Sequence, residues 1–164
     1  MRDLRILKDL QNIRLHRVEA AQKAVQVALK NVVLAKEALK KAESILEEYS
    51  AQLPSLIDAL YLKCMNKAVG QSVVEEVRAN ELKLLSKKEE YRGECQNAQD
   101  ELAKCEQNVI QAKNTLKKEQ LKYDGFGELV KEEVRKNTIE LERQENKKMD
   151  EFSSNKYITN NSSL

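Results

Sequence analysis

The chain has 164 residues, of which 34% are charged and 4% aromatic, with no Trp, four Gly and one Pro. Globular domains of this length contain more aromatic residues and far more Gly and Pro. Lys and Arg (29) nearly balance Asp and Glu (27), so the charge gives no indication of a nucleic-acid partner. The composition excludes a turn-rich nucleotide-binding α/β fold, argues against an enclosed active site, and predicts an all-α protein built from long helices.

The first predicted element is a long helix over about residues 3–68. Positions spaced alternately by three and four residues form the heptad ladder of a coiled coil, and only Gln11 and Arg14 among them are polar. Pro54 removes one hydrogen bond within the helix, so we expect a bend there and not a helix end. The first ladder consists of Leu4, Leu7, Gln11, Arg14, Val18, Ala21, Val25, Ala28, Val32, Ala35, Leu39, Ala42, Leu46, Tyr49, Leu53, Leu56 and Leu60.

A turn is predicted at about residues 69–72. Gly70 can end the first helix in the left-handed conformation. Ser72 and Glu75 have the spacing of a capping box, which would start the next helix. A connection this short between two long helices predicts an antiparallel hairpin.

The second helix is predicted over about residues 73–151. Beyond Val130 the heptad spacing of the ladder is interrupted. The ladder then continues through Val134, Thr138, Leu141, Glu145, Met149 and Phe152. Residues 153–164 are polar and rich in Asn and Ser, so we expect a disordered tail. The second ladder consists of Val74, Val77, Glu81, Leu84, Lys88, Tyr91, Cys95, Ala98, Leu102, Cys105, Val109, Ala112, Leu116, Glu119, Tyr123, Phe126 and Val130.

Two glycines, Gly125 and Gly127, lie inside the second predicted helix, where each costs about 1 kcal/mol. They indicate either a hinge or close contact with a partner, or a tolerated weak point of the helix. The sequence leaves both interpretations open.

The register of the hairpin follows from the position of the turn. Folding back around Gly70 places residues at equal separations from it opposite each other, so Tyr49 faces Tyr91 and Arg14 faces Phe126. A slide by a whole heptad would preserve the apolar match and stays an alternative. The sequence thus predicts one hairpin over residues 1–152, monomeric in isolation, with arms on the order of 100 Å long.

No catalytic or metal-binding constellation is visible. His16 is the only histidine, so one chain cannot form a histidine-based metal site or a catalytic triad. There is no P-loop sequence, and carboxylates on exposed helices lack the burial that general acid–base catalysis needs. The sequence predicts a non-enzymatic protein without cofactor or metal.

The cysteines and the hydropathy indicate a cytoplasmic protein. Cys64, Cys95 and Cys105 are odd in number and include no C-x-x-C pair, which is typical of small apolar residues in a reducing compartment. No apolar run approaches the ~18 residues that a membrane span needs. We therefore expect no membrane insertion.

Two segments resemble the YscO/FliJ family of type III secretion and flagellar export. Residues 15–24 are similar to the family's N-terminal L-x-R-V-E-x-A-x-K-A stretch, and residues 126–133 are similar to the F-x-E-L-V-[RK]-x-E segment of the YscO branch. Residues 149–152 resemble the tail of that branch. The resemblance extends over residues 1–152, although residues 50–90 carry no matching motif and Gly125 departs from the family pattern.

The resemblance implies a cytoplasmic central-stalk protein at the cytoplasmic face of the inner-membrane export apparatus. Its implied partners are the hexameric secretion ATPase, whose pore the paired terminal ends would enter, the cytoplasmic ring of the export gate, and secretion chaperones. We predict that the surface facing the ATPase consists of Arg14, Arg17, Phe126, Leu129, Val130 and Lys131.

Two other functions stay open at this stage. A generic coiled-coil adaptor or prefoldin-like chaperone hairpin would need exposed apolar tips, and the residues around Gly70 are only mildly apolar. A nucleic-acid-binding arm would need a continuous basic stripe, whereas Lys and Glu are interleaved along this chain.

Overall fold

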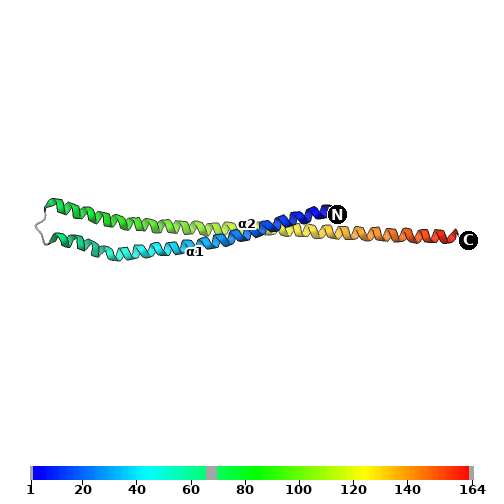
Figure 1. Cartoon of the computed structure of the whole chain (residues 1–164), viewed down its shortest axis with the longest axis horizontal. Helices are drawn as coiled ribbons and strands as arrows, with labels where there is room; N and C mark the ends of the chain where they lie inside the picture. The colour runs from blue at the N-terminus through cyan, green and yellow to red at the C-terminus, as the bar shows by residue number, and fades with distance from the viewer. Residues whose placement is uncertain (1, 66–69, 163–164) are drawn as a thin grey trace. The chain divides into compact units, whose positions relative to one another are not determined.

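The computed structural model describes residues 2–65 and 70–162. These residues form two helices, α1 (Arg2–Met65) and α2 (Gln71–Asn161), which are shown in Figure 1. The prediction of an all-α two-helix hairpin is confirmed. The predicted end of the first helix and the predicted start of the turn fall on residues 66–69, outside the described residues.

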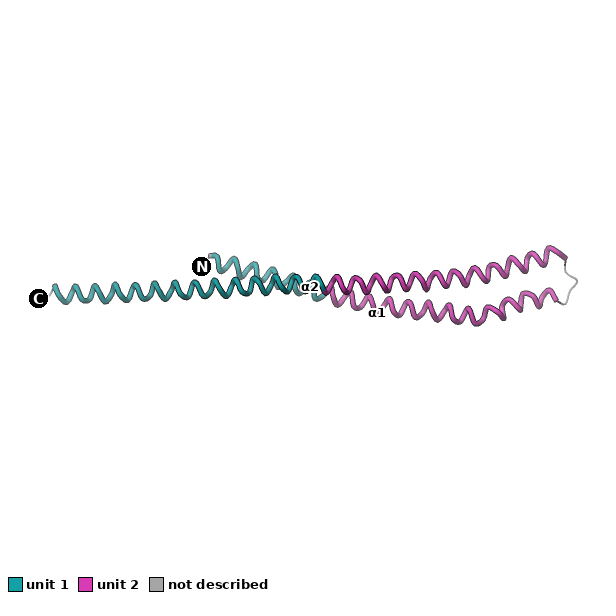
Figure 2. The backbone as a smooth tube through the Cα atoms, turned by 180° about the vertical axis from the view of Figure 1, so that it is seen from behind, with its two compact units in different colours: residues 1–23, 114–164 teal, residues 24–113 magenta. Residues whose placement is uncertain are grey.

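The chain divides into two compact units, and each unit pairs a segment of α1 with a segment of α2 (Figure 2). Unit 1 comprises residues 1–23 and 114–164, and unit 2 comprises residues 24–113. In unit 2, Tyr49 contacts Tyr91, while Tyr61, further along α1, contacts Glu81, which is earlier in α2. The two helices of this unit are therefore antiparallel.

The buried side chains all occupy positions of the two predicted ladders. They are small or medium in size, which lets two helices approach closely, and their exposed neighbours carry the charges of the chain. Burial of this apolar stripe stabilises the helix pair, because in proteins packing contributes more to helical stability than helix propensity does. The buried residues are Val18 and Ala21 in unit 1, and Ala28, Ala35, Leu53, Val77, Cys95, Cys105 and Val109 in unit 2.

An aromatic layer fixes the register of unit 2. The rings of Tyr49 and Tyr91 meet edge to face, with centroids 5.1 Å apart. The Tyr49 hydroxyl donates a hydrogen bond to the carbonyl of Leu84 at 2.8 Å, and the Lys87 ammonium lies 5.8 Å from the centre of each ring. The predicted pairing of the two tyrosines is confirmed, which excludes the alternative of a whole-heptad slide here.

Helix α1 continues through Pro54, as predicted, and bends in its turquoise stretch in Figure 1. The ladder position after Leu53 was predicted at Leu56, and this is wrong. Leu56 is 39% exposed, whereas Ile57 is half-buried. Pro54 cannot donate its backbone hydrogen bond, so the local turn loosens and the next inward-facing residue comes one position later.

The start of α2 also differs from the prediction. The helix begins at Gln71, so Ser72 lies inside its first turn and the predicted capping box is wrong. Gly70 follows residue 69, which lies outside the described residues, so the predicted left-handed conformation of Gly70 stays a prediction. Its carbonyl accepts a hydrogen bond from the Val73 backbone N–H at 3.1 Å, which places Gly70 just before the helix, where glycine is tolerated.

The end of α2 lies beyond the predicted boundary. The helix reaches Asn161, so the predicted disorder of residues 153–164 is wrong up to that residue, and residues 163–164 lie outside the described residues. No Gly or Pro follows Gly127, and the hydroxyls of Thr159 and Ser162 donate hydrogen bonds to carbonyls of the preceding turn. Nothing in the sequence after Gly127 interrupts the helix, so it continues to Asn161.

Candidate partner-binding site

The six predicted binding residues all belong to unit 1, but the structure separates them into two groups. Arg14, Phe126 and Val130 are half-buried between the two helices. The other three, Arg17, Leu129 and Lys131, are exposed. Only this second group presents a free surface to a partner. The first group can affect partner binding only indirectly, by joining α1 to α2.

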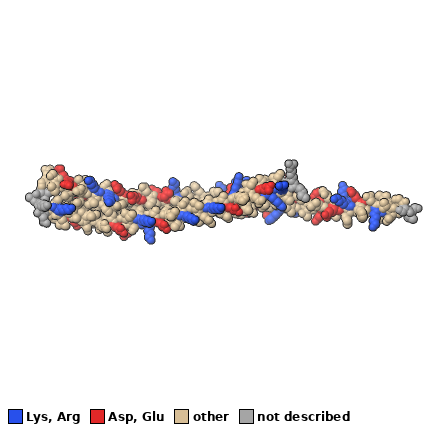
Figure 3. Space-filling view, viewed as in Figure 1, with Lys and Arg blue, Asp and Glu red and all other residues tan. Residues whose placement is uncertain are grey.

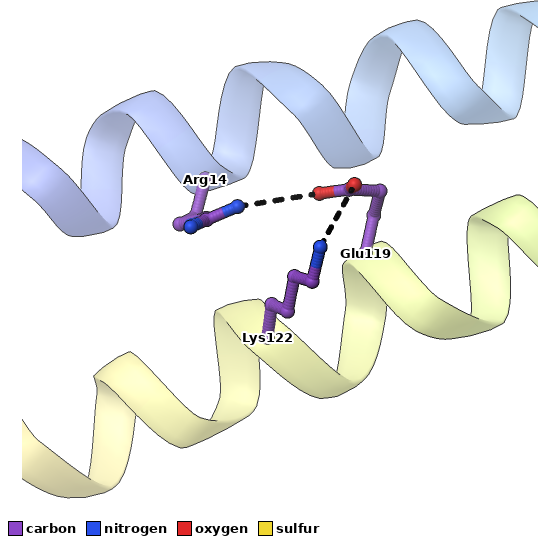
Figure 4. A network of polar contacts seen from close by, with 3 residues as sticks. All are labelled: Arg14, Glu119 and Lys122. Carbon is purple, nitrogen blue, oxygen red and sulfur yellow. Dashed lines mark ion pairs between the residues drawn. The ribbon is translucent and has the colours of Figure 1, made fainter.

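Arg14 is the centre of a polar and aromatic layer in unit 1. Its guanidinium lies 5.5 Å from the ring centre of Phe126, as expected from the predicted register. On its other side it approaches Glu119, with 3.8 Å between Nη1 and Oε2, and Glu119 is also 3.8 Å from the ammonium of Lys122. Figure 4 shows Arg14 projecting from α1 towards Glu119 and Lys122 on α2.

The charged pair in this layer is poorly solvated. The side chains of Arg14 and Glu119 are only 25% and 17% exposed. Neither Arg14 Nη1 nor Glu119 Oε2 forms a hydrogen bond with any residue that the structure describes. Desolvation costs each charge free energy that a long ion pair recovers only in part, so this pair contributes little net stability.

The exposed group lies among alternating charges. Lys131 forms an ion pair with Glu128 at 3.0 Å, and one turn later Lys136 pairs with Glu132 at 3.3 Å. Leu129 stands between these charges and is half exposed. On the face shown in Figure 3, basic and acidic side chains are interleaved and form no continuous basic stripe. Charges of both signs therefore surround the three exposed residues.

The sequence interpretation missed an uncovered stretch of α2. Helix α1 begins at Arg2, so α2 continues past it within unit 1 (Figure 2). Leu141, Met149 and Phe152, which the sequence placed in the hairpin, are 51%, 68% and 71% exposed. The register itself was the available signal, because residues further from Gly70 than Arg2 have no α1 residue to face.

A groove adjoins this uncovered stretch. It has a volume of about 520 Å³, and its lining includes Leu4 of α1 and Val134, Thr138 and Leu141 of α2. Leu4 near the start of α1 is the lining residue from that helix, and α2 supplies the others. The described residues contain no cluster of three or more His, Cys, Asp or Glu side chains that could hold a metal ion.

A tyrosine in unit 2 has a perturbed pKa, away from the predicted site. The Tyr61 hydroxyl donates a hydrogen bond to the Glu81 carboxylate at 2.5 Å. This bond, and to a smaller extent desolvation and the negative charge of Glu81, raise the pKa of Tyr61 above its ordinary value. The pair joins α1 to α2 near the turn, and Cys64, one turn further along α1, adds a smaller contribution that also raises the pKa of Tyr61.

The glycines near the site sit within a continuous helix. A Cβ added to Gly125 would meet nothing within 4 Å, and one added to Gly127 would lie 3.4 Å from Nε2 of Gln11, the mobile end of a flexible side chain. Neither glycine is required for close packing of α1 on α2. The two glycines are therefore not explained by a close contact within the chain, which favours their interpretation as a tolerated weak point of the helix. Whether Gly125 contacts a partner is a question for experiment.

Gly125→Ala is expected to raise the free energy of unfolding by about 1 kcal/mol, because alanine restricts the unfolded chain and favours the helix. Chemical denaturation followed by circular dichroism measures the change. Gly93→Ala is the matched control in unit 2, since its Cβ also meets nothing within 4 Å. Equal stabilisation by both changes identifies Gly125 as a weak point, whereas a loss of partner binding confined to Gly125→Ala would identify a contact.

Comparisons with known proteins agree with this architecture. The family model described as "Type III secretion protein YscO" matches residues 7–155. The crystal structure of the type III secretion protein YscO from Vibrio parahaemolyticus superposes with a TM-score of 0.88 at 19% sequence identity, covering 92% of this chain and 95% of that one. At this identity the likeness shows the fold.

Two further findings complete the comparison. No curated protein sequence matches the chain. Within the residues that the structure describes, neither helix contains an apolar stretch sufficient to cross a lipid bilayer. The family match extends over most of the chain and includes both helices, and on this basis the protein belongs to the YscO family of type III secretion proteins.

Proposed function

We propose that the protein is a non-enzymatic central stalk of a type III secretion system, located at the cytoplasmic face of the export apparatus. In this proposal unit 1 enters the pore of the hexameric secretion ATPase, and the protein links the ATPase to the cytoplasmic ring of the export gate. Secretion chaperones are further partners. Membership of the YscO family supports the secretion context.

The observation that carries the proposal is the uncovered stretch of α2 in unit 1. Its apolar side chains at Leu141, Met149 and Phe152 are more than half exposed. An apolar stripe on a helix gains stability only when another surface removes it from water. A hollow partner that surrounds the end of the hairpin would cover this stripe together with the exposed residues upstream of it.

The division of the six predicted residues refines their roles. Arg17, Leu129 and Lys131 are exposed and form the surface that would contact the ATPase. Arg14 and Phe126 contact each other between the helices, so they would act by holding α1 and α2 in register. Substitutions in the first group should affect binding without affecting folding.

The test is ATP hydrolysis by the cognate secretion ATPase, measured with and without the full chain. We expect stimulation of hydrolysis, and we expect the triple variant Arg17→Ala/Leu129→Ala/Lys131→Ala to weaken binding at least about tenfold, as loss of several interface contacts does. The matched control is Lys30→Ala/Leu34→Ala/Lys36→Ala, which removes two cations and one exposed leucine from unit 2. Unchanged binding and stimulation by the first variant would refute the assignment of the surface.

A second candidate function is a coiled-coil adaptor or chaperone hairpin. It is favoured by an exposed apolar cluster in unit 2, where Leu29, Val33 and Leu34 line a depression of about 370 Å³. Absence of both ATPase binding and stimulation by the native chain would reject the stalk proposal. Binding of unfolded or exported clients that Leu34→Ser weakens would then support the adaptor.

A further inference from the structure

Helix α1 carries a second stripe of residues in unit 2 (magenta in Figure 2), beside the ladder that faces α2. Each residue of this stripe directly precedes a ladder residue, so the stripe lies about 100° around the helix from α2. Every ladder residue from Val25 to Leu46 is buried or half-buried, so the heptad spacing holds along this stretch. The stripe consists of Ala24, Val27, Asn31, Leu34, Ala38, Lys41 and Ile45, all of which are exposed.

The stripe has the spacing and the composition of a coiled-coil seam. Its large apolar side chains, at Val27, Leu34 and Ile45, are 57%, 61% and 46% exposed. Lys41 is its one charged member, in a chain of which 34% of the residues are charged. The corresponding positions of α2 in this unit, one residue before each ladder residue, are mostly charged. An apolar stripe at this spacing is typical of a helix face that another helix covers.

Asn31 indicates which helix can cover the stripe. It precedes Leu34 by three residues, so Asn31 is at an a position of this seam and Leu34 at a d position. A buried amide costs free energy unless a partner forms hydrogen bonds with it. In a parallel pair of identical α1 helices each residue faces its own equivalent, so the two Asn31 amides can bond to each other. A single Asn at an a position fixes the register of parallel two-stranded coiled coils in this way.

The position of the stripe leaves room for a second copy. Packed helices have axes about 8 to 10 Å apart, so a helix on the stripe would lie about 14 Å from the axis of α2. This exceeds the diameter of a helix with its side chains, about 10 to 12 Å, so the second helix does not displace α2. A two-fold axis parallel to the helices places the two α2 helices on opposite sides of the α1 pair.

A parallel pair uses the stripe more fully than an antiparallel pair does. In a parallel pair Ile45 faces Ile45, and only the Lys41 layer brings like charges together. Lysine stems are long enough to place both ammonium groups in water, so this layer weakens the pair without preventing it. An antiparallel pair centred on Asn31 would match Val27 with Leu34 but would leave Ile45 without an apolar counterpart.

We propose that the protein self-associates through this stripe as a parallel two-fold dimer of α1 over residues 24–45. The contact spans about three heptads and includes small alanine side chains, so the dimer is weak, with a Kd on the order of 100 µM. The proposal departs from the monomer expected from the sequence. It uses unit 2 and needs no ATPase, so it can fail independently of the stalk proposal, whose surface lies in unit 1.

Leu34 also takes part in the other experiments on this protein. It lines the depression that favours the adaptor function, so clients bound there would compete with the dimer. At concentrations well below the Kd the chain is a single copy. Leu34→Ala therefore remains a neutral control in the ATPase and unfolding measurements.

Sedimentation equilibrium of the full chain over about 5 to about 500 µM tests the dimer. We expect the mass to rise from 18.9 kDa towards twice that value. Leu34→Ala should weaken association at least about tenfold, because it removes a large apolar side chain from the middle of the contact. Leu82→Ala is the matched control and should leave association unchanged, since Leu82 lies on α2 in the same unit and is 67% exposed. A constant mass of one copy, or equal effects of the two variants, would overturn the proposal.

The charge of Lys41 tests the parallel register. In a parallel pair of Lys41→Glu chains two glutamates face each other, whereas a mixed pair with the native chain places glutamate opposite lysine. Fluorescence anisotropy of labelled Lys41→Glu gives its Kd for the unlabelled native chain and for its own unlabelled form. We expect the native chain to bind at least about threefold more tightly, because opposite charges replace like charges. Equal Kd values, as an antiparallel pair would give, would overturn the proposed pairing.

Discussion

Replacing both Arg14 and Glu119 by leucine is expected to raise the free energy of unfolding by about 2 kcal/mol, although the change removes an ion pair. The two side chains are largely buried, their closest charged atoms are 3.8 Å apart, and Nη1 and Oε2 have no hydrogen-bond partner among the described residues. Replacement of such a pair by apolar side chains is often stabilising, because the charges no longer have to lose water.

The single variant Glu119→Leu is the control for this effect. It leaves the Arg14 charge between the helices without its carboxylate partner, so we expect a loss of about 1 kcal/mol. Both values are obtained from urea denaturation followed by circular dichroism. A double variant less stable than the native chain would show that the ion pair contributes net stability.

The same double variant separates folding from function. If the polar layer serves to hold one register, the leucine pair can slip by a heptad more easily, because a uniform apolar ladder fits several alignments. Binding to the ATPase should then weaken even though the variant is more stable. Unchanged binding would show that the tyrosine layer and the remaining ladder suffice to fix the register.

The positions of the buried residues could be predicted from the sequence because heptad spacing alone determines which side chains face a partner helix. Val18 and Val109 are examples, and both are buried. The pairing of Tyr49 with Tyr91 followed from the location of Gly70. The slip after Pro54 could not be predicted, because spacing does not say how far a missing hydrogen bond loosens a helical turn.

The binding residues were only partly predictable. Arg14, Phe126 and Val130 already belonged to the ladders, so their half-buried positions could have been inferred from the same spacing. The contact of Arg14 with Glu119 could not be inferred from the spacing. The ladder predicts only which residue lies directly opposite, whereas the long Arg14 side chain reaches a residue of the neighbouring layer. The helical state of residues 153–161 could not be predicted from composition, because polar residues are equally common in a disordered tail and in a solvated helix.

Leu53→Ala is expected to lower the free energy of unfolding by about 3 kcal/mol. Leu53 is only 5% exposed, which makes it one of the most buried large side chains of the chain. Truncation to alanine removes apolar contacts and leaves a cavity, which costs 2 to 5 kcal/mol at buried leucines. Because Pro54 has no N–H to donate to the carbonyl four residues before it, side-chain packing has to hold α1 on α2 at this point.

Two comparisons make this prediction specific. Leu34→Ala removes the same atoms from a side chain that is 61% exposed in the same helix and unit, so we expect a change within about 0.5 kcal/mol. Ile57→Ala should be more destabilising than Leu56→Ala, since Ile57 is half-buried and Leu56 is exposed. A larger loss of stability for Leu56→Ala than for Ile57→Ala would contradict the slip after Pro54. It would instead support the ladder predicted from the sequence, because an uninterrupted heptad brings Leu56 inward.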